Sequence, residues 1–213
     1  MKTIKLVSII LLNYMSCLLS TAQQNNTVPD LSKITDTSKW ASVNRKISYN
    51  SGVFLNGKPG DGLLYLKKFS FSTGKIELDI KGKDAQGMSF VGIAFHGMND
   101  STFDAVYFRP FNFKNPQRNS HSVQYISMPS NDWYKLRNEH PGVYENAVTP
   151  VPEPDSWFHA TIVIETGIIK VYVNNAETPS LTVEPIGDNK KGWVGFWVGN
   201  NSEGWFKNLK ITE

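Results

Sequence analysis

The densest group of side chains suited to ligand binding lies in residues 102–137. The segment mixes aromatic rings with amides, a histidine and arginines, namely Tyr107, Arg109, Phe111, Asn112, His121, Gln124, Tyr125, Trp133, Tyr134 and Arg137. Flat rings stack on the C–H faces of a sugar, while fork-shaped donors and amides meet its hydroxyls. The same residue types also occur as core aromatics and solvated arginines. As a cluster they indicate a binding site for a polyhydroxylated ligand such as a sugar.

Within this cluster we assign roles to individual residues. Two side chains are candidates for proton transfer, Glu145 as general acid with His121 nearby, although their separation in sequence does not by itself bring them together. The candidates for ligand binding are Tyr107, Arg109, Gln124, Tyr125, Trp133 and Arg137. We expect one pocket, roofed by residues 129–146, to be bordered by Tyr107, Arg109, His121, Gln124, Tyr125 and Trp133.

Strand alternation constrains this pocket. Tyr107 and Arg109 share one face of an expected strand, and Asp104 falls on the other. In a regular strand, His121 and Tyr125 share one face and Gln124 points to the other. For all three to line the pocket, a bulge must intervene; otherwise Gln124 faces the core. Arg109 lies among phenylalanines and needs a polar partner or a ligand. Its expected partner is Asp104 or Glu145.

A metal site has little support in the sequence. The four histidines, His96, His121, His140 and His159, form no short-spaced ligand pair. The only cysteine is Cys17. We therefore predict no metal or cofactor, and keep calcium as an alternative on the loops Asn99–Ser101 and 188–189.

The elements that must position these residues are strands. From Trp40 onward the apolar period is two. Gly- and Asn-rich turns separate strands expected at 47–55, 62–68, 74–81, 88–96, 103–111, 121–128, 157–165, 168–174, 179–184, 192–198 and 204–212. This pattern predicts an all-β sandwich of two antiparallel sheets. One short helix is expected at 131–139, capped by Asn131, followed by a proline-rich loop at 146–156.

The N-terminus predicts a targeting signal. Lys2 and Lys5 precede an apolar run, and Ser20-Thr21-Ala22 provides a small-residue cleavage site, so residues 1–22 are expected to be a signal peptide. Lipid anchoring through Cys17 is the second alternative. The run is too short for a membrane span. We expect a secreted or periplasmic bacterial protein, with a flexible segment at 23–39 and a single domain at 40–213.

Charge argues against nucleic acid as a partner. The full chain holds 22 Lys and Arg against 19 Asp and Glu. Loss of Lys2 and Lys5 with the signal leaves 20 against 19, and no basic tract remains. We therefore expect a carbohydrate partner, neither nucleic acid nor a membrane span, and the sequence carries no signal for an oligomeric state.

The C-terminal half carries a family resemblance. The motifs are Trp157-Phe158-His159-Ala160, Val171-Tyr172-Val173-Asn174, Gly192-Trp193-Val194-Gly195-Phe196 and Phe206-Lys207-Asn208-Leu209-Lys210-Ile211. They resemble the concanavalin A-like lectin/glucanase superfamily, and more closely its secreted bacterial 3-keto-disaccharide hydrolase domains, often labelled glycosyl hydrolases. Asn175 replaces the family's usual Gly. The resemblance spans about residues 40–212 and implies a jelly-roll domain that handles glycans.

The resemblance invites a test for family-16 chemistry. Glycoside hydrolysis normally needs two carboxyl groups across the scissile bond, and family-16 enzymes carry three acids on one strand. Here Glu77 and Asp79 match, but Lys81 or Gly82 stands in place of the third. The alternative, which we favour over a family-16 mechanism, is a polar, exposed strand face. We therefore interpret the chain as a secreted glycan-active domain that binds a sugar or sugar derivative. If the domain is an enzyme, we expect it to hydrolyse that ligand. A non-catalytic carbohydrate-binding module is the alternative.

Overall fold

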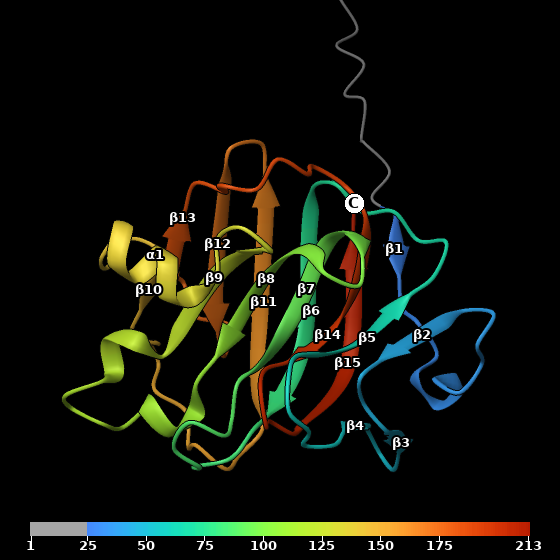
Figure 1. Cartoon of the computed structure of the whole chain (residues 1–213), viewed down its shortest axis with the longest axis horizontal. Coiled ribbons are helices and arrows are strands. Elements are labelled where there is room, and N and C mark those ends of the chain that lie inside the picture. The colour runs from blue at the N-terminus through green and yellow to red at the C-terminus, as the bar shows by residue number, and fades with distance from the viewer. Residues whose placement is uncertain (1–24) are drawn as a thin grey trace, which may run out of the picture.

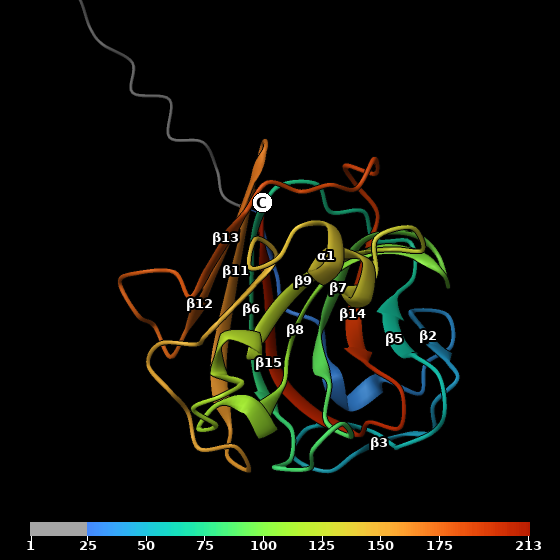
Figure 2. The same cartoon turned by 60° about the vertical axis from the view of Figure 1, so that its left-hand side comes forward.

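The computed structural model describes residues 25–213 as two antiparallel β-sheets packed face to face (Figures 1 and 2). The period of two in the sequence builds this arrangement. On strand β6 (Gly74–Lys81), Ile76, Leu78 and Ile80 are buried, and the residues between them are only partly covered. The predicted two-sheet sandwich with one short helix is confirmed.

The first sheet, sheet A, has eight strands. Its order is β13 (Leu181–Val183), β12 (Ile168–Val173), β11 (Phe158–Glu165), β6, β15 (Gly204–Thr212), β4 (Val53–Leu55) and β3 (Ile47–Tyr49), with β1 (Asn26–Thr27) paired to β15. The hairpin of β11 and β12 has the register expected from alternation, with Ala160 opposite Val173 and Ile162 opposite Val171.

The second sheet, sheet B, has seven strands and carries the residues of interest. Its order is β10 (Glu145–Asn146), β9 (Val123–Met128), β8 (Thr102–Phe108), β7 (Val91–Asn99), β14 (Trp193–Val198), β5 (Gly62–Leu66) and β2 (Trp40–Val43). Strands β7, β8, β9 and β14 are buried along nearly their whole length. A strand buried on both faces requires cover on its outer side as well as its inner side.

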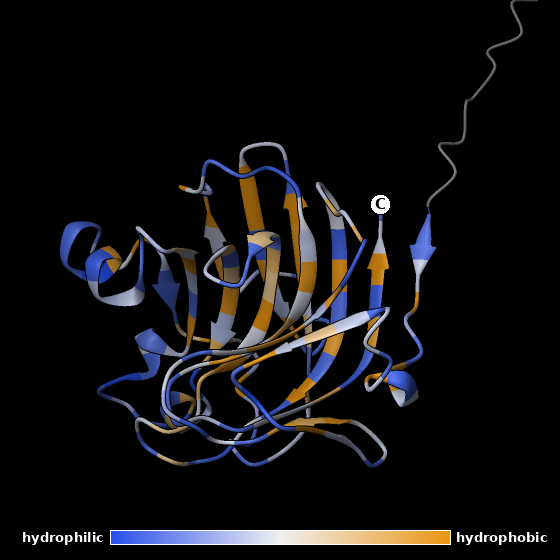
Figure 3. Cartoon of the chain, turned by 45° about the vertical axis from the view of Figure 1, so that its right-hand side comes forward, coloured by the Kyte–Doolittle hydropathy of each residue, from blue (hydrophilic) through white to orange (hydrophobic). Residues whose placement is uncertain are grey.

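The inner faces of the two sheets form the core. The ring of Phe196 on sheet B stacks on Phe206 of sheet A at 4.7 Å, and Phe108 of sheet B meets Phe158 of sheet A edge-on at 4.9 Å. Figure 3 shows apolar and polar bands alternating along the strands of both sheets. Such interdigitated aromatic packing stabilises a chain that has no cysteine within its described residues.

Short helices connect the strands around sheet B. The α-helix α1 (Trp133–Glu139) lies near β10, the edge strand of sheet B (Figure 1). Asp132, not the expected Asn131, caps it, because the Asp132 side chain accepts a hydrogen bond from Lys135 N at 2.8 Å. The 3-10 helices are η1 (Leu31–Lys33), η2 (Pro110–Asn112) and η3 (Asn119–His121).

The N-terminal part of the described chain is more ordered than expected. Residues 23–39 were predicted to be flexible, but β1 pairs with β15, and Ile34 is buried in the core. Strand pairing and apolar burial therefore extend the domain to about residue 26. The predicted signal peptide and Cys17 lie outside the described residues. None of the helices formed by residues 25–213 is long and apolar enough to cross a membrane.

A buried polar pair lies between the sheets beneath strand β8. A register shift in β7 accompanies a positive φ of 54° at His96. His96 Nδ1 lies 3.0 Å from Asp104 Oδ2, and its Nε2 lies 2.8 Å from the carbonyl oxygen of Ser72. Burial raises the pKa of the neighbouring Tyr125 hydroxyl, and Asp104 adds to the shift. Asp104 thus faces the core, opposite to Tyr107, as alternation predicts.

The buried pair yields a stability prediction. Asp104→Asn should lower the free energy of unfolding by about 3 kcal/mol, because it removes the charged partner of His96 at a site where the two residues are 2% and 3% exposed. Urea denaturation measures the change. Asp188→Asn, an exposed acid, is the matched control and should change stability by less than about 0.5 kcal/mol. Equal effects of the two substitutions would contradict the prediction.

Candidate functional site

The outer face of sheet B carries the candidate site. Tyr107 on β8 stands opposite Gln124 on β9 and shares its face, while Val106 stands opposite Tyr125 on the other face. Since Phe108 packs onto sheet A, the face of Tyr107 and Gln124 is the outer one. Gln124 therefore belongs with Tyr107, and Tyr125 points between the sheets instead of into the expected pocket.

His121 reaches the site from a turn and not from a strand. The expected strand 121–128 begins only at Val123, and His121 closes the 3-10 helix η3. Its carbonyl oxygen accepts hydrogen bonds from Arg109 Nη1 at 2.9 Å and from Asn112 Nδ2 at 3.1 Å. The alternation argument did not apply to His121, because a turn precedes the strand. The two bonds fix this turn against the start of η2.

Arg109 lies at the centre of the site and is almost fully buried. Its Nη2 donates to the Tyr107 hydroxyl at 2.6 Å and to Gln124 Oε1, and its Nη1 also lies 3.5 Å from Glu145 Oε2. The Tyr107 hydroxyl in turn donates to Gln124 Oε1 at 3.0 Å. Of the two partners expected for Arg109, the structure brings it to Glu145 and not to Asp104. Burial raises the pKa of Tyr107 to about 12, so its hydroxyl stays protonated near neutral pH.

Glu145 lies among three basic side chains. Strand β10 pairs with β9 and sets Glu145 beside Gln124. Arg137 Nε and Nη2 donate to the two carboxylate oxygens at 2.7 and 2.6 Å, and His121 Nδ1 lies 2.9 Å from Oε1. Burial acts to raise the pKa of Glu145, but Arg137, His121 and Arg109 outweigh it and hold the pKa below its ordinary value. Glu145 is therefore an ionised carboxylate, which disfavours the expected role of general acid.

Helix α1 brings Trp133 and Arg137 to the same site. The two residues are one turn apart, and the guanidinium carbon of Arg137 lies 5.1 Å from the Trp133 ring centre. Trp133 is 45% exposed, so one face of its ring is open to a ligand. Residues 129–146, which were expected to roof the pocket, thus supply an aromatic surface and a cation.

Two adjoining cavities, of about 230 and 360 Å³, open on this face of sheet B. We call them together the cleft. They share the lining residues Phe90, Trp133 and Asn200. The smaller one, the acidic end, is also lined by Asp61, Tyr107, Ile126, Met128, Asp132, Trp197 and Gly199. The larger one, the basic end, is also lined by Gln86, Gly87, Arg109, Phe111, Asn112, Arg118, His121 and Arg137. Of the predicted site residues, Tyr107, Arg109, His121, Trp133 and Arg137 line the cleft, and Gln124 and Glu145 lie behind its wall.

Sequence reasoning missed part of the acidic end. Asp61 follows a Pro-Gly turn and carries no local signal, but the pairing of β5 with β14 sets it near Trp197. Asp61 is an exposed residue, but the protein atoms packed around its carboxyl partly desolvate it and raise its pKa, against the opposing effects of Arg45 and Trp197. Trp197 belongs to β14, whose residues are all buried. A raised pKa in a cleft marks Asp61 as a proton-donor candidate.

The two acids that match the family-16 motif lie elsewhere. Glu77 and Asp79 project from the outer face of sheet A, away from the cleft. Glu77 pairs with Lys75 at 3.1 Å, and Asp79 accepts from Asn208 at 2.7 Å and lies 2.8 Å from His159. These contacts form a polar surface network on an exposed strand face, which was the alternative interpretation.

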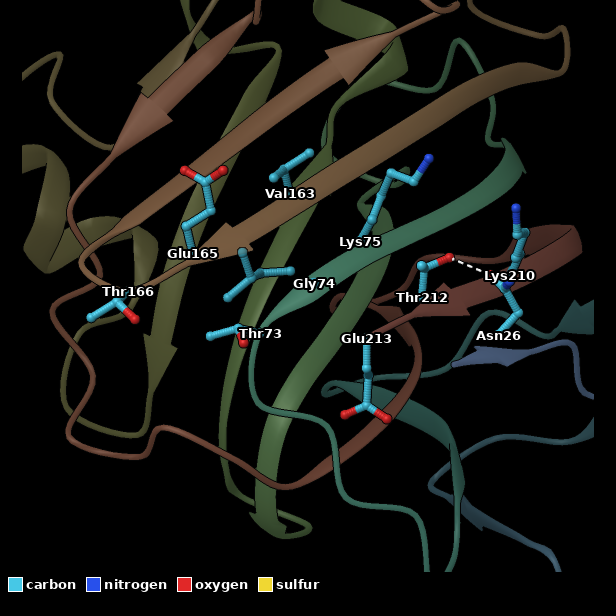
Figure 4. Close-up of a pocket in the computed structure, with 11 residues that line it drawn as sticks. Asn26, Thr73, Gly74, Lys75, Val163, Glu165, Thr166, Lys210, Thr212 and Glu213 are labelled. Atoms are coloured by element: carbon cyan, nitrogen blue, oxygen red, sulfur yellow. Dashed lines mark hydrogen bonds between the residues drawn. The ribbon is translucent and has the colours of Figure 1, made fainter. Parts of the chain in front are cut away.

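A larger hollow lies at one end of the central strands of sheet A (Figure 4). It has a volume of about 500 Å³ and is lined by the ends of β6, β11 and β15, with Lys75, Glu165, Lys210 and Glu213 around it. None of the described residues that line it is aromatic. Because sugar recognition depends on ring stacking, the cleft on sheet B is the better candidate.

The described residues offer no evident metal centre. Between residues 25 and 213, no three or more His, Cys, Asp or Glu side chains come together in a way that could hold a metal ion. In the loop considered for calcium, Asn99 Oδ1 accepts from Ser101 N at 3.0 Å, and Asp100 Oδ1 accepts from the Tyr65 hydroxyl at 3.0 Å. These oxygens serve the turn and a neighbouring ring.

Comparisons with known proteins place the chain among glycan-related folds. The model of a family described as the 3-keto-alpha-glucoside-1,2-lyase-like domain matches residues 31–212. A carbohydrate-binding module, CBM66, from Bacillus subtilis is similar at 17% identity, with 81% of this chain and 95% of that chain covered and a TM-score of 0.61.

Two glucanases share the fold. A Bacillus licheniformis β-glucanase is 12% identical over 91% of this chain and 99% of that chain, with a TM-score of 0.57. A family-16 endo-glucanase from Bacteroides ovatus, in complex with G4G3G-2F-DNP, is 9% identical over 84% and 96%, with a TM-score of 0.56. No curated protein matches the sequence. The likenesses confirm the predicted concanavalin A-like jelly-roll fold.

The charge cluster at Glu145 predicts a pH-dependent loss of stability on substitution. Near pH 7, Glu145→Gln should lower the free energy of unfolding by about 3 kcal/mol, because it leaves Arg109 and Arg137 without their shared anion. The folded pKa of Glu145 is lowered from 4.5, so the stabilisation is complete above about pH 4.5 and is lost as the pH falls through the folded pKa.

Urea denaturation of both proteins from neutral to acidic pH measures this difference. The gap between parent and Glu145→Gln should shrink at acidic pH. Glu139→Gln, on the exposed side of α1, is the control and should show little effect. A gap that is constant across the whole pH range would contradict the assignment of Glu145 as the ionised group.

Proposed function

Since the chain belongs to the 3-keto-alpha-glucoside-1,2-lyase-like domain family, as its motifs predicted, we propose that it is a glycan-active domain whose cleft on sheet B binds the sugar. The observation that carries this proposal is the meeting of Trp133, Trp197 and Tyr107 with charged groups at both ends of one cleft. Aromatic faces with a few convergent polar groups suit a sugar ring. The carbohydrate-binding module and the glucanases with the same fold support the ligand class.

For the reaction, we favour the elimination that the family's description names. In a sugar with a keto group at carbon 3, a base removes the proton from carbon 2, and the electron pair forms the C1=C2 double bond. The C1–O bond breaks, and the leaving oxygen takes a proton. The products are an unsaturated keto sugar and an alcohol, and no other reactant is consumed.

The cleft offers a group for each proton transfer. His121 is the candidate base, because it lines the cleft beside the Glu145 carboxylate, with Nδ1 2.9 Å from Oε1 but not oriented for a hydrogen bond. Glu145 then acts as a positioning residue, because its lowered pKa makes it a poor donor. Asp61, whose pKa is raised, is the candidate acid for the leaving oxygen.

A non-catalytic binding module is the second candidate function. It is favoured by the position of Glu77 and Asp79 on the outer face of sheet A, with Lys81 where the third acid of the family-16 motif would stand. A chain that only binds would retain the aromatic cleft and produce no new sugar species from a glycoside. Product analysis therefore distinguishes the two candidates.

We further infer that the protein is exported to the periplasm or beyond the cell. The basis is the order of Lys2 and Lys5, an apolar run and Ser20-Thr21-Ala22. A glycan-active domain acts where polysaccharides and their fragments are found, which agrees with export. Mass spectrometry of the native protein identifies the mature N-terminus, expected at Gln23. A retained segment 1–22, or a lipid on Cys17, would contradict this inference.

The proposed reaction predicts the effect of removing the acid. Asp61→Asn should lower kcat on a 3-keto disaccharide by about a hundredfold to a thousandfold. Ultraviolet absorbance of the conjugated product follows the reaction. In the parent, kcat should fall as the pH rises through the raised pKa of Asp61, because the acid must be protonated to donate.

Glu77→Gln is the matched control, because Glu77 is an acid on the opposite sheet and should leave kcat largely unchanged. Full activity of a folded Asp61→Asn variant would remove Asp61 from the mechanism. Formation of the free, saturated 3-keto sugar in place of the unsaturated product would identify hydrolysis instead of elimination. An absence of any product would favour the binding module.

The aromatic surface gives a separate prediction for binding. Trp133→Ala should weaken sugar binding about tenfold, since it removes the exposed ring shared by both ends of the cleft. Titration calorimetry measures this loss. Trp157→Ala removes a similarly exposed ring that packs over Lys207 on sheet A and should leave binding unchanged. Equal affinity of parent and Trp133→Ala would place the sugar elsewhere.

A further inference from the structure

We propose that the basic end of the cleft binds the acidic group of an anionic sugar residue, such as a uronate or a sugar sulfate. This inference rests on the proposed sugar-binding function and adds the charge of the ligand to it. Its basis is the charge and hydrogen-bonding state of Arg118, Arg137, His121 and Asn112, which line one cavity of about 360 Å³.

Positive charge dominates this cavity. Arg109, Arg118 and Arg137 line it, and none of the described residues in its wall is an acid. Glu145, behind the wall, is the carboxylate that Arg109 and Arg137 share. Three guanidinium groups against one carboxylate leave two positive charges, whatever the state of His121. A concave wall with uncompensated positive charge raises the local concentration of anions.

Arg109 is not the ligand-binding group. Tyr107, Gln124, the His121 carbonyl and Glu145 occupy its two terminal nitrogens. A buried guanidinium with these partners fixes the wall and supplies charge at a distance. The groups that contact the ligand must therefore be the more exposed ones.

Arg137 and Arg118 have donors to spare. Arg137 uses Nε and Nη2 for Glu145, and its side chain is 32% exposed, so Nη1 remains for a ligand. Arg118 bonds Gln86 through Nη2, and its Nη1 makes no hydrogen bond to a described residue, whereas its Nε is buried without a partner. Fork-shaped donors of this kind match the oxygens of a carboxylate or sulfate.

A buried acceptor points to the rest of the sugar. Asn112 is 3% exposed and lines the cavity, and its Oδ1 has no hydrogen-bond partner within residues 25–213. An amide oxygen left without a partner in a buried position costs free energy unless a donor reaches it. A sugar hydroxyl is such a donor, whereas an inorganic anion such as sulfate is not. Guanidinium donors beside a free acceptor therefore suit an anionic sugar better than a bare anion.

The opposite end of the cleft sets the direction of the ligand. Asp132, whose carboxylate caps helix α1, lines the acidic end and disfavours an anion there, and Asp61 adds to this effect only when it is ionised. Trp133 lies between the two ends and lines both cavities. An oligosaccharide that stacks on Trp133 would therefore place its acidic residue at Arg118 and Arg137, and a neutral residue beside Asp61.

The test uses three probes on the mature chain: a neutral gluco-disaccharide, its counterpart with one glucuronate, and its 6-sulfated counterpart. Titration calorimetry should show that at least one anionic probe binds about tenfold more tightly than the neutral one at low salt. Raising NaCl to about 500 mM should remove most of this preference and leave the affinity for the neutral probe nearly unchanged.

Substitution of Arg118 locates the effect. Arg118→Ala should weaken binding of the anionic probes about tenfold and leave neutral binding within about twofold, and Arg118→Glu should abolish the preference. Lys114→Ala makes the same change in net charge at an exposed residue paired with Glu153, outside the cavity wall, and should have no effect. Thermal unfolding of each variant confirms that it is folded.

The outcomes separate this inference from the proposed function. Equal affinity for neutral and anionic probes, or a preference that Arg118→Glu leaves intact, overturns the anionic subsite and leaves the sugar-binding cleft standing. If none of the three disaccharides binds and Trp133→Ala changes nothing, the proposed function itself fails and the subsite fails with it. Binding of inorganic sulfate as tight as that of the sulfated sugar also overturns the proposal.

Discussion

The cleft depends on one buried carboxylate. A charge that has left water must be paired, and Glu145 meets this requirement with Arg137, Arg109 and His121. Its partners come from helix α1, the end of strand β8 and the turn η3, which are three separate elements of the segment 102–139. One ion therefore connects the segments that form the basic end. The two short turns and the single helix would otherwise have little apolar surface to hold them in place.

The burial of sheet B on both its inner and its outer face follows from the same arrangement. The inner face packs on sheet A through aromatic contacts, and the outer face is covered by α1, η2, η3 and their polar network. Tyr107 and Gln124 could not stand on an ordinary solvated face with so little exposure. Their hydroxyl and amide are instead satisfied by the guanidinium of Arg109. The polar layer on this sheet thus acts as a second core.

The fold followed from the sequence because period-two alternation is a local property, and β6, β11 and β12 display it plainly. The site followed only in part. Alternation placed Tyr107 and Arg109 together, but it misplaced Tyr125, since a turn and not a strand carries His121. Asp61 could not be found in this way, because strand order in sheet B, which the sequence does not encode locally, brings it to the cleft.

The division of the cleft into an acidic and a basic end has a consequence beyond affinity. Asp132 at one end, joined by Asp61 when it is ionised, and three arginines at the other end create an electric field along the cleft. A ligand with a polar axis of its own would be turned by this field before it touches Trp133, so that it enters in one orientation. Asp61 at one end and Arg118 at the other also come from different segments, one before β5 and the other before η3. Evolution could therefore invert or abolish the field at one end, and change which way a glycan threads, without rebuilding the sandwich beneath.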